Sequence, residues 1–183
     1  MSLAYRGAEM VTPIEERPAI DGTPAIDPPA HAGRLPRSRE LSRVAARLAA
    51  EPGLWWPKVR YEQSRRYYTR ICATDDYEAW LLTWLPGQQT GLHDHGGSSG
   101  AFVVVKGALR EMTLSSTGQQ IVRTLQPARV RSFGRSFLHD VGNHGTVPAI
   151  SLHVYAPALT AMTRYERVAG RLRSLGTEAR ADW

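Results

Sequence analysis

The sequence predicts an all-β barrel or sandwich with one amphipathic helix ahead of it. From residue 59 onward, short runs rich in Val, Ile, Thr, Tyr and Trp alternate with turn-forming residues at intervals of about ten residues. These runs read RRYYTRICATD, EAWLLTWLPG, GAFVVVKGALREMTL, QIVRTLQPARVRSFG, FLHDVGN and AISLHVYAPA. The chain of 183 residues has room for one such domain with a sizeable core.

The helix is predicted over SRELSRVAARLAAEPG, which begins at residue 38. We expect Ser38 to cap its start and Gly53 to mark its end. The apolar positions recur at helical spacing and share one face: Leu41, Val44, Ala45 and Leu48.

Two terminal segments differ from this pattern. Residues 1–37 are proline-rich, repeat the motif PAID and contain little apolar sequence, so we expect a disordered or loosely docked arm. The globular domain would then span residues 38–183. Near the other end, MTRYERVAGRLRSLG favours a hairpin that turns at Ala169 and Gly170, with a helix as the alternative.

The composition narrows the class of protein. The chain is 42% hydrophobic and 22% charged, and no apolar run approaches the roughly 20 residues of a transmembrane helix. The N-terminal sequence has no apolar signal-peptide stretch, and Cys72 is the single cysteine, which excludes an intramolecular disulfide. We therefore expect a cytoplasmic protein without a membrane partner.

The net charge of +6 comes almost wholly from scattered arginines, since Lys58 and Lys106 are the only lysines. No basic run interleaves with aromatic residues, so the pattern predicts a solvated surface and no nucleic-acid partner. The positive field would at most favour small anionic substrates.

Histidines indicate a metal site. On a strand, residues i and i+2 share a face, so His93 and His95 would project side by side while Asp94 points the other way. Such a pair supplies half of a metal site. His139, in a later β-type run, could return beside the pair in an antiparallel barrel.

The sequence around these histidines resembles the motifs of the cupin superfamily. PG-x5-HDH followed by Gly107 is similar to its first motif, and His139 with Asn143 is similar to the end of its second. The acidic residue that cupins often carry after the second histidine is absent here. The resemblance therefore implies a cupin double-stranded β-helix, a jelly-roll-like barrel, with a three-histidine site.

This departure points to the thiol dioxygenases, and in particular to the cysteine dioxygenases. YYTR resembles that family's Tyr-Thr-Arg strand and SLHVY its Ser-x-His-x-Tyr strand, and the similarity runs from about residue 41 to residue 160. The resemblance implies that Fe(II) binds to His93, His95 and His139. It assigns Tyr155, His153 and Ser151 to a catalytic relay, and Arg70, Tyr68 and Tyr155 to substrate binding.

The chemistry agrees with this assignment. Three neutral imidazoles leave a ferrous ion its full double charge and an open face, where a substrate thiolate and amine and then dioxygen can bind. Arg70 offers a bidentate partner for a carboxylate. Relatives that oxidise 3-mercaptopropionate usually have glutamine at that position, so Arg70 favours L-cysteine, with cysteine sulfinate as the product.

Two departures from the family remain. Many animal members crosslink a cysteine to the active tyrosine, but Gly100 occupies the matching position, so we predict no crosslink at Tyr155. Met162, near the substrate end of the pocket, could change specificity around the amine.

Three other functions are compatible with the same sequence motifs. One is a dioxygenase of another small thiol such as 3-mercaptopropionate, another is a non-catalytic ligand-sensing cupin, and the third is a three-histidine zinc hydrolase. We expect a monomer or a weak dimer.

Overall fold

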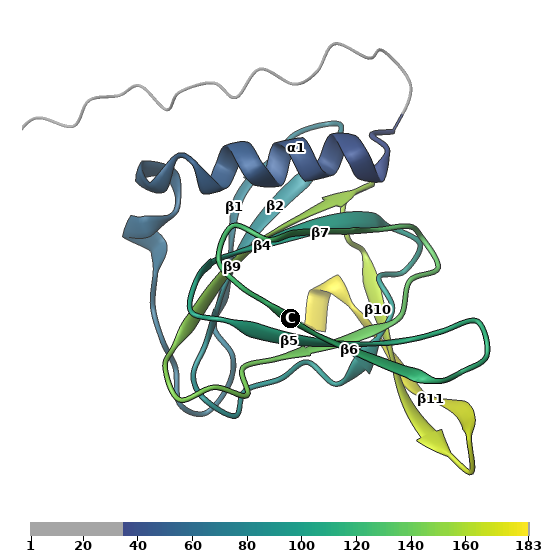
Figure 1. Ribbon diagram of the computed structural model, residues 1–183. Helices are drawn as coiled ribbons and strands as arrows, with labels where there is room; N and C mark the ends of the chain where they lie inside the picture. The colour runs from purple at the N-terminus through teal and green to yellow at the C-terminus, as the bar shows by residue number, and fades with distance from the viewer. Residues whose placement is uncertain (1–34, 183) are drawn as a thin grey trace, which may run out of the picture.

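Two antiparallel sheets form the body of the protein (Figure 1). The computed structural model describes residues 35–182, so the predicted arm lies almost entirely outside the described residues. In order across the first sheet lie β1 (Tyr68–Ala73), β2 (Glu78–Trp84), β9 (Ala149–Ala156), β4 (Ser99–Lys106) and β7 (Val130–Phe133). Across the second lie β11 (Arg171–Ala179), β10 (Ala161–Val168), β3 (Leu92–His93), β8 (His139–Gly142), β5 (Leu109–Leu114) and β6 (Gln120–Leu125). The predicted all-β, double-stranded β-helix class is confirmed.

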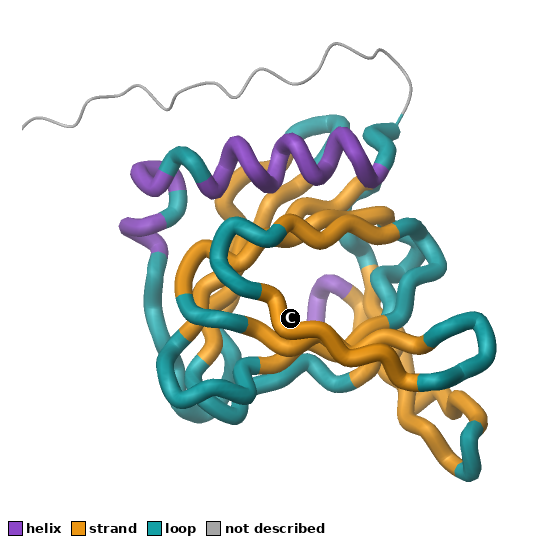
Figure 2. The backbone as a smooth tube through the Cα atoms, in the orientation of Figure 1, coloured by secondary structure: helices purple, strands orange, loops and turns teal. Residues whose placement is uncertain are grey.

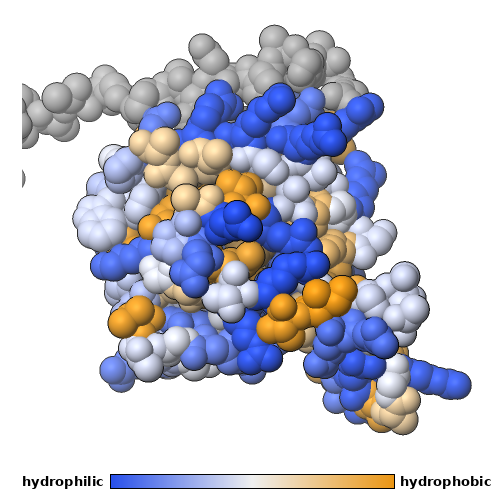
Figure 3. Space-filling view, in the orientation of Figure 1, coloured by the Kyte–Doolittle hydropathy of each residue, from blue (hydrophilic) through white to orange (hydrophobic). Residues whose placement is uncertain are grey.

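One α-helix, α1 (Ser38–Ala49), covers the first sheet, and strands dominate the rest of the described chain (Figure 2). Short 3-10 helices lie at η1 (Pro52–Leu54), η2 (Trp56–Lys58) and η3 (Arg180–Asp182). The predicted apolar face is the buried one, while the outward side is hydrophilic (Figure 3). Among residues 35–182, no helix has both the length and the apolar composition needed to cross a bilayer.

The ends of α1 differ from the prediction. Ser38 is the first helical residue and not the cap, because Arg37 precedes it in extended conformation and donates its backbone N–H to Glu40 Oε2 at 2.6 Å. The helix ends at Ala49, well before Gly53. Glu51 is already non-helical, as expected for a residue that precedes a proline.

The central strand β9 is buried on both faces. Ile150, Leu152 and Val154 join the apolar cluster that packs against α1. The alternate residues, among them Tyr155, face the space between the sheets, where a second cluster includes Trp84 and Phe102. The helix therefore covers one side of the sheet, so that the other side can carry polar side chains inside the barrel.

Tight turns divide two of the predicted runs into separate strands. The chain turns between β4 and β5 at Gly107, whose φ is +70°. A Cβ at Gly107 would lie 2.7 Å from Pro148 O, so the turn requires glycine. Ala128, with a φ of +66°, lies between β6 and β7.

The predicted hairpin at the C-terminal end is confirmed. β10 and β11 pair through a two-residue turn at Ala169 and Gly170, whose φ values of +48° and +81° are those of a type I′ turn. The hairpin tip projects from the barrel (Figure 1).

Candidate metal centre

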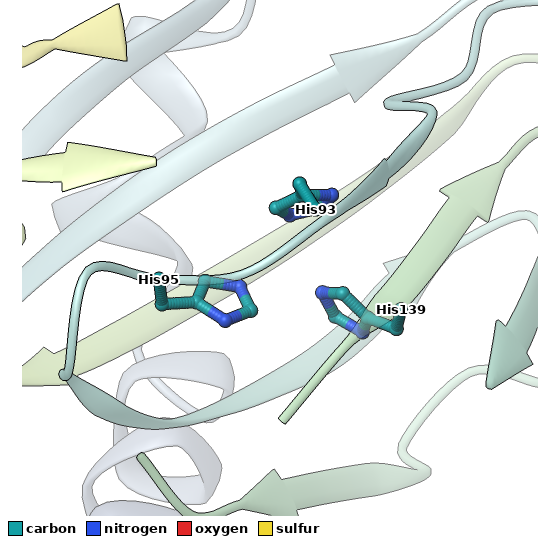
Figure 4. A group of neighbouring side chains, drawn as sticks. All are labelled: His93, His95 and His139. Atoms are coloured by element: carbon teal, nitrogen blue, oxygen red, sulfur yellow. The ribbon is translucent and has the colours of Figure 1, made fainter. Parts of the chain in front are cut away.

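Three buried imidazoles converge beside the middle strands of the second sheet. His93 on β3 and His139 on β8 are direct cross-strand partners, with ring centroids 4.9 Å apart. His95 follows β3, and its ring lies 4.9 Å from that of His93 and 5.0 Å from that of His139. The ligand atoms of all three lie within 4.8 Å of one another (Figure 4).

The two histidines of the HDH motif share the site, although they do not share a strand. β3 ends at His93, and the chain then bends through Gly96, whose φ is +56°. A Cβ at Gly96 would lie 2.6 Å from Ala161 O, so the bend requires glycine. Asp94 points away from the imidazoles and binds the backbone N–H of Gly96 and the hydroxyl of Tyr165, as its alternation predicted.

Hydrogen bonds fix which nitrogen each imidazole presents. His93 Nδ1–H donates to the carbonyl of Gly91 at 2.9 Å, and His139 Nδ1–H donates to Glu111 Oε1 at 3.0 Å. Each ring therefore keeps its Nε2 lone pair for a ligand. Neither ring nitrogen of the buried His95 has a hydrogen-bond partner among the described residues.

The electrostatics favour the neutral, ligating form. Burial, followed by the neighbouring imidazoles, lowers the pKa of His93 and of His95 well below the ordinary value. Ligating histidines must be deprotonated, so both are ready to bind a metal at neutral pH. Unpartnered buried nitrogens and a set of three imidazoles fit a divalent transition metal.

A carboxylate lies one step behind the site. Glu111 on β5 is fully buried and is held by Arg131 Nε at 2.8 Å as well as by His139. Burial alone would raise the pKa of Glu111, but the hydrogen bonds from His139 and Arg131 hold that pKa below its ordinary value. His139 therefore donates to an anion, which increases the electron-donating power of its Nε2.

The metal site opens on a small cavity of about 140 Å³. This volume lies below the range of roughly 300–1,000 Å³ that is typical of drug-sized ligands, and so suits a small molecule. The cavity brings together most of the residues that the sequence singled out, namely Tyr68, His93, His139, His153, Tyr155 and Met162. Trp80 also lines the cavity.

The three residues that the resemblance assigned to a relay form a line of hydrogen bonds on the inward face of β9. Ser151 Oγ lies 2.9 Å from His153 Nε2, and His153 Nδ1 lies 3.2 Å from the Tyr155 hydroxyl. All three side chains are buried. Burial is the main cause that raises the pKa of Tyr155, so its phenol stays protonated and able to donate at neutral pH.

Arg70 does not line this cavity. Its side chain is half exposed, and its Nη1 lies 3.8 Å from the buried carboxylate of Glu78. Two other arginines line the cavity, Arg66, which precedes β1, and Arg164. The register shift between β1 and β2 at Arg70 accompanies this difference from the sequence expectation.

Arg66 makes no ion pair with any residue that the structure describes. Its guanidinium lies 4.8 Å from the centre of the Trp84 ring, and its buried Nε has no hydrogen-bond partner among residues 35–182. Burial lowers the pKa of Arg66 to about 10, which keeps it charged at neutral pH. The other arginine of the cavity, Arg164, is held by Glu178 at 2.9 and 3.0 Å and is therefore compensated.

The space for a tyrosine crosslink is filled. Gly100 pairs with Tyr155 across β4 and β9, and a Cβ at Gly100 would lie 2.4 Å from the Phe133 ring. Cys72 packs with the cluster on the helix side of the sheet, opposite the side that holds Tyr155. The geometry agrees with the prediction of an unmodified tyrosine.

Two residues of the site were missed by sequence reasoning. Arg66 shares the two-residue period of Tyr68 and Arg70, which could have included it as an alternative. Glu111 alternates with buried Leu109 and Thr113 along β5, so an inward carboxylate could have been noticed. Glu111 and His139 lie far apart in the sequence, so no local sequence pattern predicts their contact.

We predict that His139→Ala abolishes tight binding of a divalent metal, because it removes one of the three converging nitrogens. Isothermal titration of the metal-free protein with Fe(II) or Zn(II) measures this. His144→Ala is the matched control, since His144 is exposed outside the cluster and its loss should leave affinity unchanged. Wild-type affinity in His139→Ala would contradict the three-histidine site.

We predict that Glu111→Gln weakens metal affinity by roughly 10- to 100-fold, because His139 loses its anionic acceptor. Competition with a chelator gives the dissociation constant. Glu166→Gln makes the same chemical change in an ion pair with Arg173 on the projecting hairpin and should have no effect. Equal affinities of both variants and the wild type would show that the Glu111 charge does not reach the metal site.

Comparison with known proteins gives a consistent answer. Residues 37–168 match the family model of cysteine dioxygenase type I. Cysteine dioxygenase type 1 of Danio rerio is 25% identical over 147 residues, covering 72% of this chain and 71% of the relative. The Bos taurus protein of the same name is 26% identical over 154 residues, covering 76% of this chain and 74% of the relative.

Among solved structures, a protein from Thermus thermophilus aligns with a TM-score of 0.49 at 23% identity, covering 55% of this chain and 90% of its own. A Klebsiella pneumoniae protein described as having a double-stranded beta-helix domain aligns with a TM-score of 0.48 at 22% identity, covering 54% and 78%. On the strength of the family model, which spans α1, the strands β1 to β10 and the three histidines, the chain belongs to the cysteine dioxygenase type I family of the cupin superfamily.

Proposed function

We propose that the protein is a non-haem Fe(II) dioxygenase that oxidises the thiol of L-cysteine with O2 to cysteine sulfinic acid. Family membership supports a cupin thiol dioxygenase with a metal cofactor. The observation that carries the finer proposal is one small cavity that holds a face of the imidazole cluster, the Tyr155 hydroxyl and the unpaired charge of Arg66. A small molecule with both a thiol and a carboxylate matches these three features.

His93, His95 and His139 would hold the metal through neutral nitrogens. A bound Fe(II) ion would supply open coordination positions and the redox chemistry for the reaction of a thiol with dioxygen. The protein contributes no anionic ligand at this point, since Glu111 is engaged behind His139.

Arg66 would bind the substrate carboxylate. Its Nε is buried, its charged guanidinium lines the cavity, and an anion would relieve the cost of an unpaired buried cation. Arg70 was assigned this role from the sequence, and we propose that the role passes to Arg66. Tyr68, beside it in the cavity lining, would contact the same end of the substrate.

Tyr155 would contact the reacting end of the substrate. Its ring lies 5.5 Å from the ring of the metal-site residue His95, and its protonated hydroxyl can donate to a sulfur or oxygen atom in the cavity. Behind it, His153 and Ser151 hold that hydroxyl in place. Together, the three residues would orient substrate atoms and stabilise charge, while dioxygen is the oxidant.

The test is oxygen uptake by the purified protein loaded with Fe(II). L-cysteine, 3-mercaptopropionate and cysteamine are supplied separately, with metal-free protein as the control. We expect metal-dependent uptake with L-cysteine, one O2 for each sulfinate formed. Uptake with another of these thiols alone would keep the reaction and correct the substrate. Absence of uptake with all three, in protein shown to contain iron, would favour a non-catalytic ligand-sensing cupin.

We predict that Arg66→Ala raises KM for L-cysteine and 3-mercaptopropionate by roughly 10- to 100-fold, the worth of a charged hydrogen bond, and leaves KM for cysteamine almost unchanged. Cysteamine has no carboxylate. Arg70→Ala is the matched control and should not alter the ratio of KM values. A selective loss in Arg70→Ala, with none in Arg66→Ala, would return the role to Arg70.

The cytoplasmic location, the absence of nucleic-acid or membrane partners and the monomeric or weakly dimeric state stay predictions of the sequence.

A further inference from the structure

The relay on β9 has a fourth member on the neighbouring strand. Trp84, at the end of β2, is fully buried, and its indole Nε1–H donates to Ser151 Oγ at 2.9 Å. The hydrogen bonds therefore run in one line from Trp84 through Ser151 and His153 to Tyr155.

The first bond in this line has a fixed direction. An indole nitrogen can only donate, so Ser151 Oγ must accept from Trp84. Among residues 35–182, the one other partner of that hydroxyl is His153 Nε2. The hydroxyl has a single hydrogen, and His153 Nε2 is the one acceptor near it within the described chain. If Ser151 donates to Nε2, a neutral His153 must carry its own hydrogen on Nδ1.

The opposite tautomer leaves a hydrogen in the wrong place. With Nε2 protonated, His153 would donate to Ser151, and the Ser151 hydrogen would be buried without an acceptor among the described residues. With Nδ1 protonated, the hydrogen left over belongs to Tyr155, whose hydroxyl faces the cavity and can meet a ligand or water there. The second arrangement avoids an unsatisfied buried donor.

The surroundings of His153 keep the ring in this orientation. Its plane stacks on Phe102 at 9° with centroids 4.9 Å apart, and the residue is buried. Burial lowers the pKa of His153 well below its ordinary value, so the ring is neutral at physiological pH and has one N–H to place.

We propose that Trp84 is a positioning residue that fixes His153 in its Nδ1–H tautomer and thereby turns the Tyr155 hydroxyl hydrogen into the cavity. Trp84 acts through Ser151 and does not touch the substrate. Its donor bond uses one of the two acceptor positions of the Ser151 hydroxyl and strengthens the hydrogen bond that this hydroxyl gives to His153. Only the catalytic consequence rests on the proposed dioxygenase function, because the tautomer is a property of the folded protein.

The test is the 15N nuclear magnetic resonance spectrum of His153 in the full-length, histidine-labelled protein loaded with diamagnetic Zn(II). Long-range 1H–15N correlations distinguish the protonated nitrogen, and comparison with His153→Asn assigns the signal. We expect the Nδ1–H pattern in the wild type. An Nε2–H pattern in the wild type would overturn the proposal at once, whatever the variants show.

Trp84→Phe keeps an aromatic ring and removes the N–H. The Nε2–H to Nδ1–H ratio should rise, because the Ser151 hydroxyl then gives a weaker hydrogen bond to Nε2. Because tautomers exchange rapidly, this appears as a shift of both averaged 15N signals. Trp55→Phe is the matched control: it removes a buried indole N–H that donates to Leu48 O in the other core cluster, and it should leave His153 unchanged. Signals of His153 that do not move in Trp84→Phe would contradict the role of Trp84.

A second variant covers the case in which Trp84→Phe does not fold. Ser151→Ala removes the hydroxyl that donates to His153 Nε2, so the Nε2 signal should move toward the position of a ring nitrogen without a hydrogen bond. Unmoved signals would overturn the proposal. In turnover, Trp84→Phe should lower kcat several-fold with KM unchanged. An Nδ1–H pattern in a wild-type protein that takes up no oxygen would refute the proposed function alone. Oxygen uptake by a wild-type protein that shows the Nε2–H pattern would refute this inference alone.

Discussion

The site depends on a strand that is buried on both of its faces. β9 places Ile150, Leu152 and Val154 against α1, so the alternate positions inside the barrel need not supply the apolar contacts that hold the first sheet in place. Those positions carry Ser151, His153 and Tyr155, which satisfy one another's hydrogen bonds. Without the helix, the inward positions of β9 would have to carry apolar side chains that hold the sheet in place, and polar side chains could not occupy them.

Charge is distributed so that the centre of the site is neutral. The three imidazoles are buried, and permanent charges lie near them on Glu111 and on Arg66. Glu111, matched by Arg131, lies behind His139, and Arg66 lies in the cavity without a partner for its Nε among the described residues. A metal cation and a substrate with two negative charges would therefore complement the protein, because Glu111 and Arg66 carry charges of opposite sign to them.

Period and motif predicted more of the molecule than local propensity did. The buried face of α1, the Ala169–Gly170 turn and the meeting of His139 with the HDH pair were all predictable, because alternation and antiparallel return place residues by simple geometry. The first residue of α1 was not predictable, and neither was the exclusion of Arg70 from the cavity lining. A hydrogen bond from the Arg37 backbone N–H to Glu40 decides the first, and the position of Arg70 beside the buried carboxylate of Glu78 accounts for the second. Neither leaves a trace in the pattern of apolar residues.

Phe133 prevents a single substitution at Gly100 from allowing a crosslink to Tyr155. Its ring fills the space beside Gly100 and also stacks on His95, with centroids 4.5 Å apart. A thiol introduced at position 100 would have to push this ring aside and would disturb a metal-site imidazole before it could reach Tyr155. A covalent tyrosine cofactor is thus inaccessible by one substitution in this chain: the residue at position 133 would have to shrink first, which makes the order of the two changes matter.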